Sequence, residues 1–205
     1  MLIATFSNYL ILLVIFGSSL VFKKILFKKD KNFINNIDFL YGLFFLIFFS
    51  LLINFFLPLG YFTPLIIIFG LLIFFYGFYK KLYKINFFYY FIIIFFTTFV
   101  SFYSAHNIDS PMYHLQILKW LSFHKISFGL SNLEIRFGFN SSWHSLVAIL
   151  DFSFLKFSAK YYLSSIILGI VIYEIIKFKS KINYSDIFLF LVTFFLIFFS
   201  FIHPF

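Results

Sequence analysis

The side chains that could do chemistry gather in one stretch of the chain, between residues 105 and 145. This stretch holds four of the five histidines, two acids and the single arginine: His106, Asp109, His114, His124, Glu134, Arg136 and His144. A carboxylate near imidazoles can act as a general base or bind a divalent cation, and an arginine can bind a phosphate through two parallel hydrogen bonds. We therefore expect any catalytic or binding site in this segment.

Asp109 is the candidate catalytic residue, and the run around it allows two interpretations. In the local one, Asp109 or Ser110 caps the next helix and Pro111 lies in its first turn. In the functional one, Asp109 is a carboxylate at the membrane surface that acts as a general base or holds a divalent cation. The two are compatible, because a capping residue is held firmly. A metal site of His106, Asp109 and His114 stays open as an alternative, but their spacing fixes no ligand geometry, so no metal ligand or cofactor is assigned.

Arg136 is the one arginine among sixteen basic residues. It can bind a phosphate in a bidentate way, or it can pair with Glu134 or with a lipid headgroup. A little further on, Asn140 is a candidate cap for the following helix. Trp143 is expected to anchor that helix at the membrane interface, with stacking on a sugar as the alternative.

The composition of the whole chain indicates a membrane protein. Of its 205 residues, 63% are hydrophobic and only 11% are charged, whereas soluble domains are about a quarter charged. Its 40 phenylalanines cannot all be buried in a soluble core of this size, because such a domain leaves a large surface to cover. With no cysteine, a disulfide scaffold is also excluded.

Six apolar segments are suited to cross a bilayer as helices, which takes about 20 residues each. None has a charge near its centre, and single polar residues such as Asn54 are expected to form interhelical hydrogen bonds. Unbroken apolar runs favour helices over barrel strands, which alternate. The segments are Leu2–Phe22, Phe39–Leu57, Phe62–Tyr79, Phe87–Ser104, Lys160–Ile176 and Tyr184–Ile202. The sequence thus predicts an all-α fold: a polytopic transmembrane helical bundle of about six spans, forming one integral membrane domain over residues 1–205.

Lysine clusters predict the orientation of the chain. They follow the first, third and fifth spans, around residues 23–31, 80–84 and 177–181. The positive-inside rule puts them in the cytoplasm, with the N-terminus and a long segment of about residues 105–159 on the outer face. The net charge of +9 is therefore mainly a topological signal. We expect the lipid bilayer as partner and no nucleic acid, and the bacterial inner (plasma) membrane as location.

Two interfacial helices are expected in the outer segment. Between residues 143 and 157 the apolar side chains recur at helical spacing, with His144 and Asp151 away from the centre of the stripe. A helix with one apolar and one polar face lies in the plane of the interface. A second, weaker candidate covers residues 111–124. The stripe is formed by Trp143, Leu146, Val147, Leu150, Phe154 and Phe157.

Two runs in the outer segment carry a family resemblance. They are Asp109-Ser110-Pro111-Met112-Tyr113-His114, continuing to Trp120, and Arg136-Phe137-Gly138-Phe139-Asn140-Ser141-Ser142-Trp143. An acid after a span, a Tyr four residues on and two surface helices resemble the first outer loop of the glycosyltransferase C superfamily, polytopic enzymes that take sugars from polyprenyl-phosphate donors. The order Tyr113-His114, Trp120 and then Arg136 to Asn140-Ser141-Ser142-Trp143 also resembles a run in a poorly characterised bacterial membrane family. Together the resemblance covers about residues 85–180.

The resemblance implies a cell-envelope transferase: a membrane glycosyltransferase, or the N-terminal part of one, that uses a polyprenyl-phosphate-linked sugar at the outer face. It implies Asp109 as general base or metal ligand. The candidate substrate-binding residues are Tyr113, His114, Arg136, Asn140 and Trp143.

The chain departs from that superfamily in two respects. Three spans precede the acidic loop instead of one, and six spans are fewer than such enzymes usually have. The chain is therefore expected to be a fragment of a longer protein, with a natural end as the alternative. Other functions stay open: a polysaccharide polymerase or ligase, a non-enzymatic membrane subunit, or a transporter. Transport is disfavoured because the spans have no central charge.

Overall fold

The computed structural model describes residues 2–27, 33–104, 114–127, 129, 132, 135, 142–151 and 163–178. Within these residues the chain is all-helical, with no strand beyond a single bridge between Ile34 and Tyr83. The α-helices are α1 (Leu2–Phe27), α2 (Phe39–Phe56), α3 (Thr63–Tyr79), α4 (Phe87–Ser104), α5 (Leu115–Phe123), α6 (Ser142–Ile149) and α7 (Leu163–Phe178). The all-α prediction is confirmed.

Five of the six predicted spans fall on α1, α2, α3, α4 and α7, and the sixth, Tyr184–Ile202, lies outside the described residues. Local sequence explains where the α2–α3 hairpin turns. The helix ends at Phe56 because Leu57 precedes Pro58, and a residue before proline is disfavoured in the helical conformation. By length and composition, two stretches of the described chain can cross a membrane, Thr5–Phe27 and Asn36–Phe56, and the other apolar helices are shorter.

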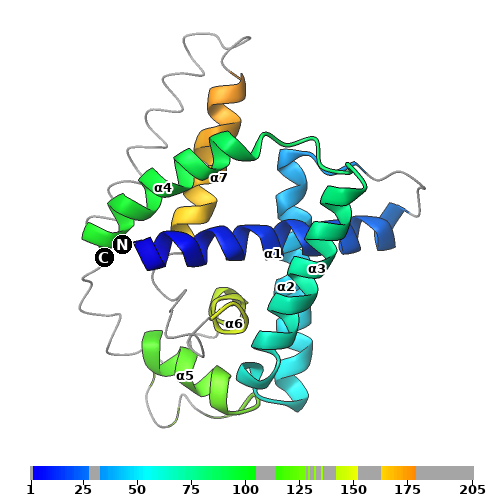
Figure 1. Ribbon diagram of the computed structural model, residues 1–205. Helices are drawn as coiled ribbons and strands as arrows, with labels where there is room; N and C mark the ends of the chain where they lie inside the picture. Colours follow the sequence, from blue (N-terminus) through cyan, green and yellow to red (C-terminus); the bar gives the residue numbers. More distant parts are fainter. Residues whose placement is uncertain are drawn as a thin grey trace.

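Helix α1 lies at the centre of the molecule, with α2 and α3 packed on one part of it and α4 and α7 nearer its start (Figure 1). Glycines allow the closest approaches. A Cβ atom added to Gly17 of α1 would overlap the carbonyl oxygen of Gly70 in α3, and one added to Gly42 of α2 would overlap the carbonyl oxygen of Ile15. Small residues let helix backbones approach closely, as in many membrane proteins.

Helices α2 and α3 bury small and polar side chains together with some apolar ones such as Phe39 and Phe74, and they expose many large apolar side chains. The buried set includes Gly42, Ser50, Asn54, Thr63, Gly70 and Gly77. The exposed set includes Phe44, Phe48, Leu52, Phe55, Phe56, Leu65, Ile68, Phe69, Leu72 and Phe75, which are all at least 44% exposed. Water-soluble proteins rarely expose so continuous an apolar surface.

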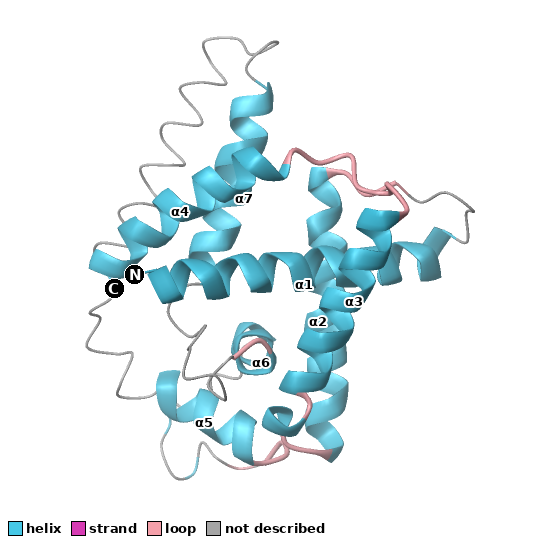
Figure 2. Cartoon of the chain, viewed as in Figure 1, coloured by secondary structure: helices cyan, strands magenta, loops and turns pink. Residues whose placement is uncertain are grey.

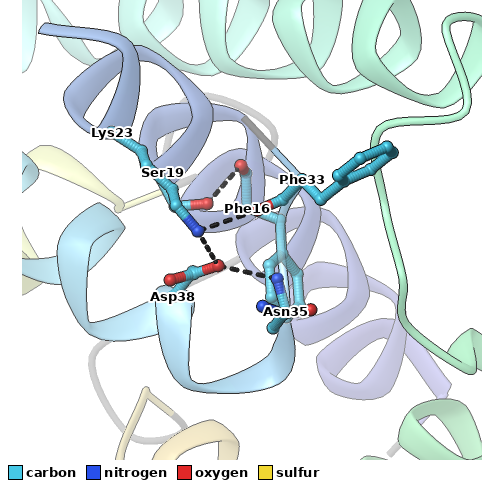
Figure 3. A network of polar contacts seen from close by, with 6 residues as sticks. All are labelled: Phe16, Ser19, Lys23, Phe33, Asn35 and Asp38. Carbon is cyan, nitrogen blue, oxygen red and sulfur yellow. Dashed lines mark hydrogen bonds and ion pairs between the residues drawn. The ribbon is translucent and has the colours of Figure 1, made fainter. Parts of the chain in front are cut away.

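Asp38 anchors the loop between α1 and α2 (Figure 3). The Nζ atom of Lys23, near the end of α1, lies 2.6 Å from Asp38 Oδ2 and donates a second hydrogen bond to the carbonyl oxygen of Phe33. The backbone N–H of Asn35 also donates to Asp38 Oδ2, at 2.7 Å. Asp38 is only 4% exposed, so its charge is compensated by a lysine and a backbone dipole instead of water.

The loop after α1 lies beside the loop after α3 (Figure 2). The backbone N–H of Ile34 donates to the carbonyl oxygen of Leu82, and the N–H of Lys84 donates to the carbonyl oxygen of Ile34, both at 2.9 Å. These contacts bring the lysines near the end of α1 to the same end of the molecule as Lys80, Lys81 and Lys84. The turn between α2 and α3 lies at the opposite end of those two helices.

A buried polar cluster joins α1 to α4 and α7. Asn8 Nδ2 donates hydrogen bonds to Thr98 Oγ1 at 2.8 Å and to Ser165 Oγ at 3.0 Å. All three side chains are fully buried. Because Asn8 lies near the start of α1, Thr98 near the end of α4 and Ser165 near the start of α7, these three helix ends lie together.

Candidate functional site

Helices α5 and α6 pack against each other and against η2 (Leu59–Tyr61), the 3₁₀ turn that joins α2 to α3 (Figure 1). The approach is close: a Cβ atom added to Gly60 would lie 2.6 Å from the carbonyl oxygen of Ser122 in α5. The histidine-bearing helices are therefore held at the end of the α2–α3 hairpin that lies away from the lysine loops.

Asn54, in the last turn of α2, fixes the end of α5. Its side-chain Nδ2 atom donates to the carbonyl oxygens of His124, at 3.2 Å, and Leu121, at 3.4 Å. The main-chain carbonyl oxygen of Asn54 accepts from the N–H of Ile126 at 2.8 Å. The C-terminal carbonyls of a helix lack partners within the helix, so Asn54 supplies donors that α5 needs. The predicted interhelical role of this residue is confirmed.

The amphipathic character predicted for the first outer helix is confirmed in α5. Ile117 and Leu121 are buried, while Gln116 and Lys119 are exposed. The ring of Trp120 is half-buried, lies 5.0 Å from the ring of His124 and donates from Nε1 to Ser127 Oγ at 3.3 Å.

Helix α6 differs from the expectation of an interfacial helix with a polar face toward water. All side chains from His144 to Ile149 are buried, and the residues expected to face water are buried with them: His144 is 8% exposed and Asp151 is 4% exposed. Helix α6 packs against α2, α5 and the turn η2, so neighbouring protein covers side chains that were expected to face water. Phe154 and Phe157 of the predicted stripe lie outside the described part of the chain.

The burial of α6 brings together two histidines that the sequence separates by 30 residues. His114 Nδ1 lies 2.9 Å from His144 Nε2, and the ring centroids are 5.2 Å apart. Since a neutral imidazole has one N–H and one bare nitrogen, one ring donates and the other accepts, and the contact contains one proton. The remaining nitrogen of His144, Nδ1, is buried with no hydrogen-bond partner among the described residues.

The environment of His144 keeps it neutral at pH 7. Burial lowers the pKa of its imidazole from the usual 6.5, because desolvation disfavours the charged form, and charge on neighbouring His114 lowers the pKa further. The buried, neutral imidazole of His144 can pass a proton to the half-buried imidazole of His114 or fix which nitrogen of that ring carries a proton. General acid–base sites use imidazoles in this way.

The structure describes two of the six predicted site residues. His114 is in the imidazole pair, and Trp143, the neighbour of His144, is half-buried against the core. Asp109, Tyr113, Arg136 and Asn140 lie outside the described residues, as does His106 of the alternative metal site. Within the described ranges, no three His, Asp or Glu side chains come together to hold a metal ion.

The pairing of His144 with His114 was not predicted from the sequence. The available signal was weak: both residues lie at the starts of predicted helices in the same segment. Nothing in the spacing showed that the two helices pack against each other, because residues 30 apart have no periodic relationship.

Fold and site together define an all-helical protein with an apolar, membrane-type surface and a histidine pair at one end. The chain belongs to the family described as "Domain of unknown function (DUF8201)", which matches residues 1–204. No curated protein and no solved structure matches the chain.

Proposed function

We propose that the chain is an integral membrane protein of about six spans, in the bacterial inner membrane, with its N-terminus outside. The exposed faces of α2 and α3 support this. They present phenylalanine, leucine and isoleucine outward and bury glycine, serine and asparagine. Apolar surface exposed to water costs about 25 cal/mol per Å², whereas lipid tails are as apolar as these side chains. A lipid environment would make such a surface stable.

The positions of the loops support the proposed orientation. The described part of the loop after α1 lies beside the lysine-bearing loop after α3, linked by the backbone hydrogen bonds of Ile34, and α5 and α6 pack at the other end of the α2–α3 hairpin. If the lysine end is cytoplasmic, as the positive-inside rule requires, the histidine pair belongs to the outer face.

The function we propose is sugar transfer from a polyprenyl-phosphate carrier at that outer face. The single observation that supports an enzymatic site is the contact between His114 and His144, which form a hydrogen-bonded imidazole pair. The pair stands out in a chain of which only 11% of the residues are charged. Buried, perturbed imidazoles are more frequent at catalytic sites than elsewhere.

In the proposed reaction, Asp109 removes the proton from the acceptor hydroxyl as its oxygen attacks the anomeric carbon of the sugar. The bond between that carbon and the phosphate oxygen breaks, and the lipid phosphate leaves with the bonding electrons. One direct displacement inverts the anomeric configuration. Negative charge grows on the leaving phosphate, so Arg136 and a donor from His114 would stabilise it. Tyr113, Asn140 and Trp143 would contact the sugar, and a divalent cation at Asp109 is the alternative to its role as base.

Substitution of Asp109 tests this function in a strain whose native gene is deleted. Asp109→Asn keeps the size of the side chain and removes the base, so surface-glycan assembly should fall by about 10²- to 10⁴-fold, the usual contribution of a general base. Asp30→Asn, a carboxylate in the predicted cytoplasmic lysine loop, is the matched control and should keep full activity. Equal membrane levels of both variants must be verified by immunoblot. Full glycan assembly with Asp109→Asn would exclude the proposed role of this carboxylate.

A further inference from the structure

We propose that His144 is a positioning residue, which holds His114 as the neutral tautomer with its proton on Nε2. The catalytic consequence of this inference rests on the proposed function, but the tautomer itself does not. Three observations carry the argument: the 2.9 Å contact between the two rings, the burial of His144, and the missing partner of its Nδ1 atom.

The contact permits two arrangements of the protons. In the first, His144 carries its proton on Nε2 and donates it to a bare Nδ1 of His114. In the second, His114 carries its proton on Nδ1 and donates it to a bare Nε2 of His144. Because each neutral ring has a single proton, the choice at the contact also decides which outer nitrogen is protonated in each ring.

The buried Nδ1 atom of His144 distinguishes the two arrangements. In the second arrangement this atom carries a proton that no described residue accepts, which leaves a buried donor unsatisfied. In the first arrangement it is a bare acceptor. Unsatisfied buried N–H donors are rarer in proteins than under-satisfied acceptors, so the first arrangement is favoured. His144 then donates from Nε2, and its position is fixed by the packing of α6.

The tautomer of His114 follows directly. Its Nδ1 atom accepts from His144, so the proton of the neutral ring must be on Nε2. If His114 were protonated, its Nδ1–H would face the Nε2–H of His144. To relieve that repulsion, the His144 proton would have to move to Nδ1, the nitrogen that has no partner. The pair therefore favours a neutral His114 that offers an N–H donor from Nε2. In the proposed reaction this donor would bind an oxygen of the lipid-linked phosphate without giving up its proton.

Nitrogen NMR tests the tautomer on the full-length protein in lipid nanodiscs, with ¹⁵N-labelled histidine and no affinity tag. Protonated and bare ring nitrogens resonate in well-separated regions, and the signals of His114 are assigned by their loss in His114→Gln. We expect a bare, hydrogen-bonded Nδ1 and a protonated Nε2 for His114 at pH 7. A protonated Nδ1 in the wild-type protein would overturn the proposal, whether or not any variant folds.

Two substitutions of His144 test positioning against mere packing. His144→Phe keeps a ring but removes the donor, and the His114 signals should shift toward a mixture of tautomers. His144→Gln retains an N–H near the place of Nε2 and should restore the wild-type pattern. The matched control is His124→Phe, an exposed histidine at the end of α5, which should leave His114 unchanged. An unchanged His114 spectrum in His144→Phe, or failure of Gln to restore it, would contradict positioning.

The activity assay is separate from the spectra. If the proposed function holds, His144→Phe should lower the rate of glycan assembly by on the order of 10²-fold, the usual effect of a misplaced active-site group, and His144→Gln should lower it less. If Asp109→Asn retains full activity, the proposed function fails, whereas the tautomer of His114 is still decided by its own spectrum.

Discussion

Asn8 Nδ2 donates a 2.8 Å hydrogen bond to Thr98 Oγ1, across 90 residues of sequence and between two apolar helices. The same amide donates its other hydrogen to Ser165, so one carboxamide links α1, α4 and α7. In a hydrocarbon environment these groups have no water to bond instead, and interhelical hydrogen bonds there contribute about 0.6 kcal/mol on average, up to about 1.7. The cluster is therefore a specific link between α1 and the pair of helices α4 and α7.

Thr98→Val should destabilise the protein more than Thr97→Val. The two threonines are adjacent and buried, and valine has nearly the same shape, but Thr97 Oγ1 donates only to Ile94 of its own helix. We expect an extra loss of about 0.6–1.7 kcal/mol for Thr98→Val, because Asn8 loses an acceptor in another helix. Thermal or denaturant unfolding in one detergent measures it. Equal losses for the two variants would mean that the link contributes nothing.

Gly17→Ala should destabilise the protein much more than Gly169→Ala. The new Cβ atom at Gly17 would overlap the carbonyl oxygen of Gly70, and backbone cannot move away easily. At Gly169 the nearest atoms are side-chain atoms of Ile94 and Thr97, at 3.2 and 3.3 Å. Overpacking costs about 1–3 kcal/mol, whereas alanine gains up to about 1 kcal/mol in helix propensity, which offsets the mild crowding at Gly169. A similar fall in melting temperature for both would refute the close α1–α3 contact.

The helices were predictable because each apolar run is long and ends at proline, lysine or polar residues. The end of α2 at Phe56 and the start of α3 at Thr63 each lie within one residue of the predicted segments Phe39–Leu57 and Phe62–Tyr79. The link from Asn8 to Thr98 was not predictable, because single polar residues in apolar runs carry no sign of their partners. Tertiary packing, and not local sequence, pairs them.

The candidate site was predictable only as a segment. Its histidines stood out because the rest of the chain has only one other. The amphipathic pattern also predicted correctly that α5 buries Ile117 and Leu121. The pattern in α6 was misleading: His144 and Asp151 fall away from the predicted apolar stripe, yet both are buried, and α6 packs against α2 and α5. Periodicity identifies a face of a helix but does not tell whether water, lipid or protein covers it.

Asn54→Leu should loosen the end of α5 without unfolding the α2–α3 hairpin. The change removes the Nδ2 donor to the carbonyl oxygens of Leu121 and His124, so the last turn of α5 loses its cap. We expect faster amide hydrogen exchange over residues 121–127, by roughly 5- to 30-fold for a loss of about 1–2 kcal/mol. Ser50→Ala is the control, because Ser50 Oγ donates only within α2. Unchanged exchange over 121–127 would show that Asn54 does not hold α5.

Single-cysteine labelling should place Gln116 and Asn86 on opposite sides of the membrane. The chain has no cysteine, so each variant has one reactive site, and both side chains are exposed. Gln116→Cys in α5 should react with a membrane-impermeant maleimide in intact cells. Asn86→Cys, in the loop beside the lysines, should react only after permeabilisation. Labelling of both variants in intact cells would contradict the proposed orientation.

Acid should destabilise the wild-type protein more than His144→Phe. The folded protein holds the pKa of His144 below 6.5, while the unfolded chain protonates this residue near 6.5. Above that pH the residue is neutral in both states and contributes no pH dependence. Below it the unfolded state binds a proton that the folded state does not, so stability falls as the pH falls.

Tryptophan fluorescence follows unfolding, since Trp143 is the neighbour of His144 and Trp120 lies in α5. The difference in the free energy of unfolding between the wild type and His144→Phe should be constant from pH 8 to about 6.5. At lower pH the wild type should lose more of this free energy than the variant. A constant difference down to pH 5 would mean that His144 is not held neutral by its buried position.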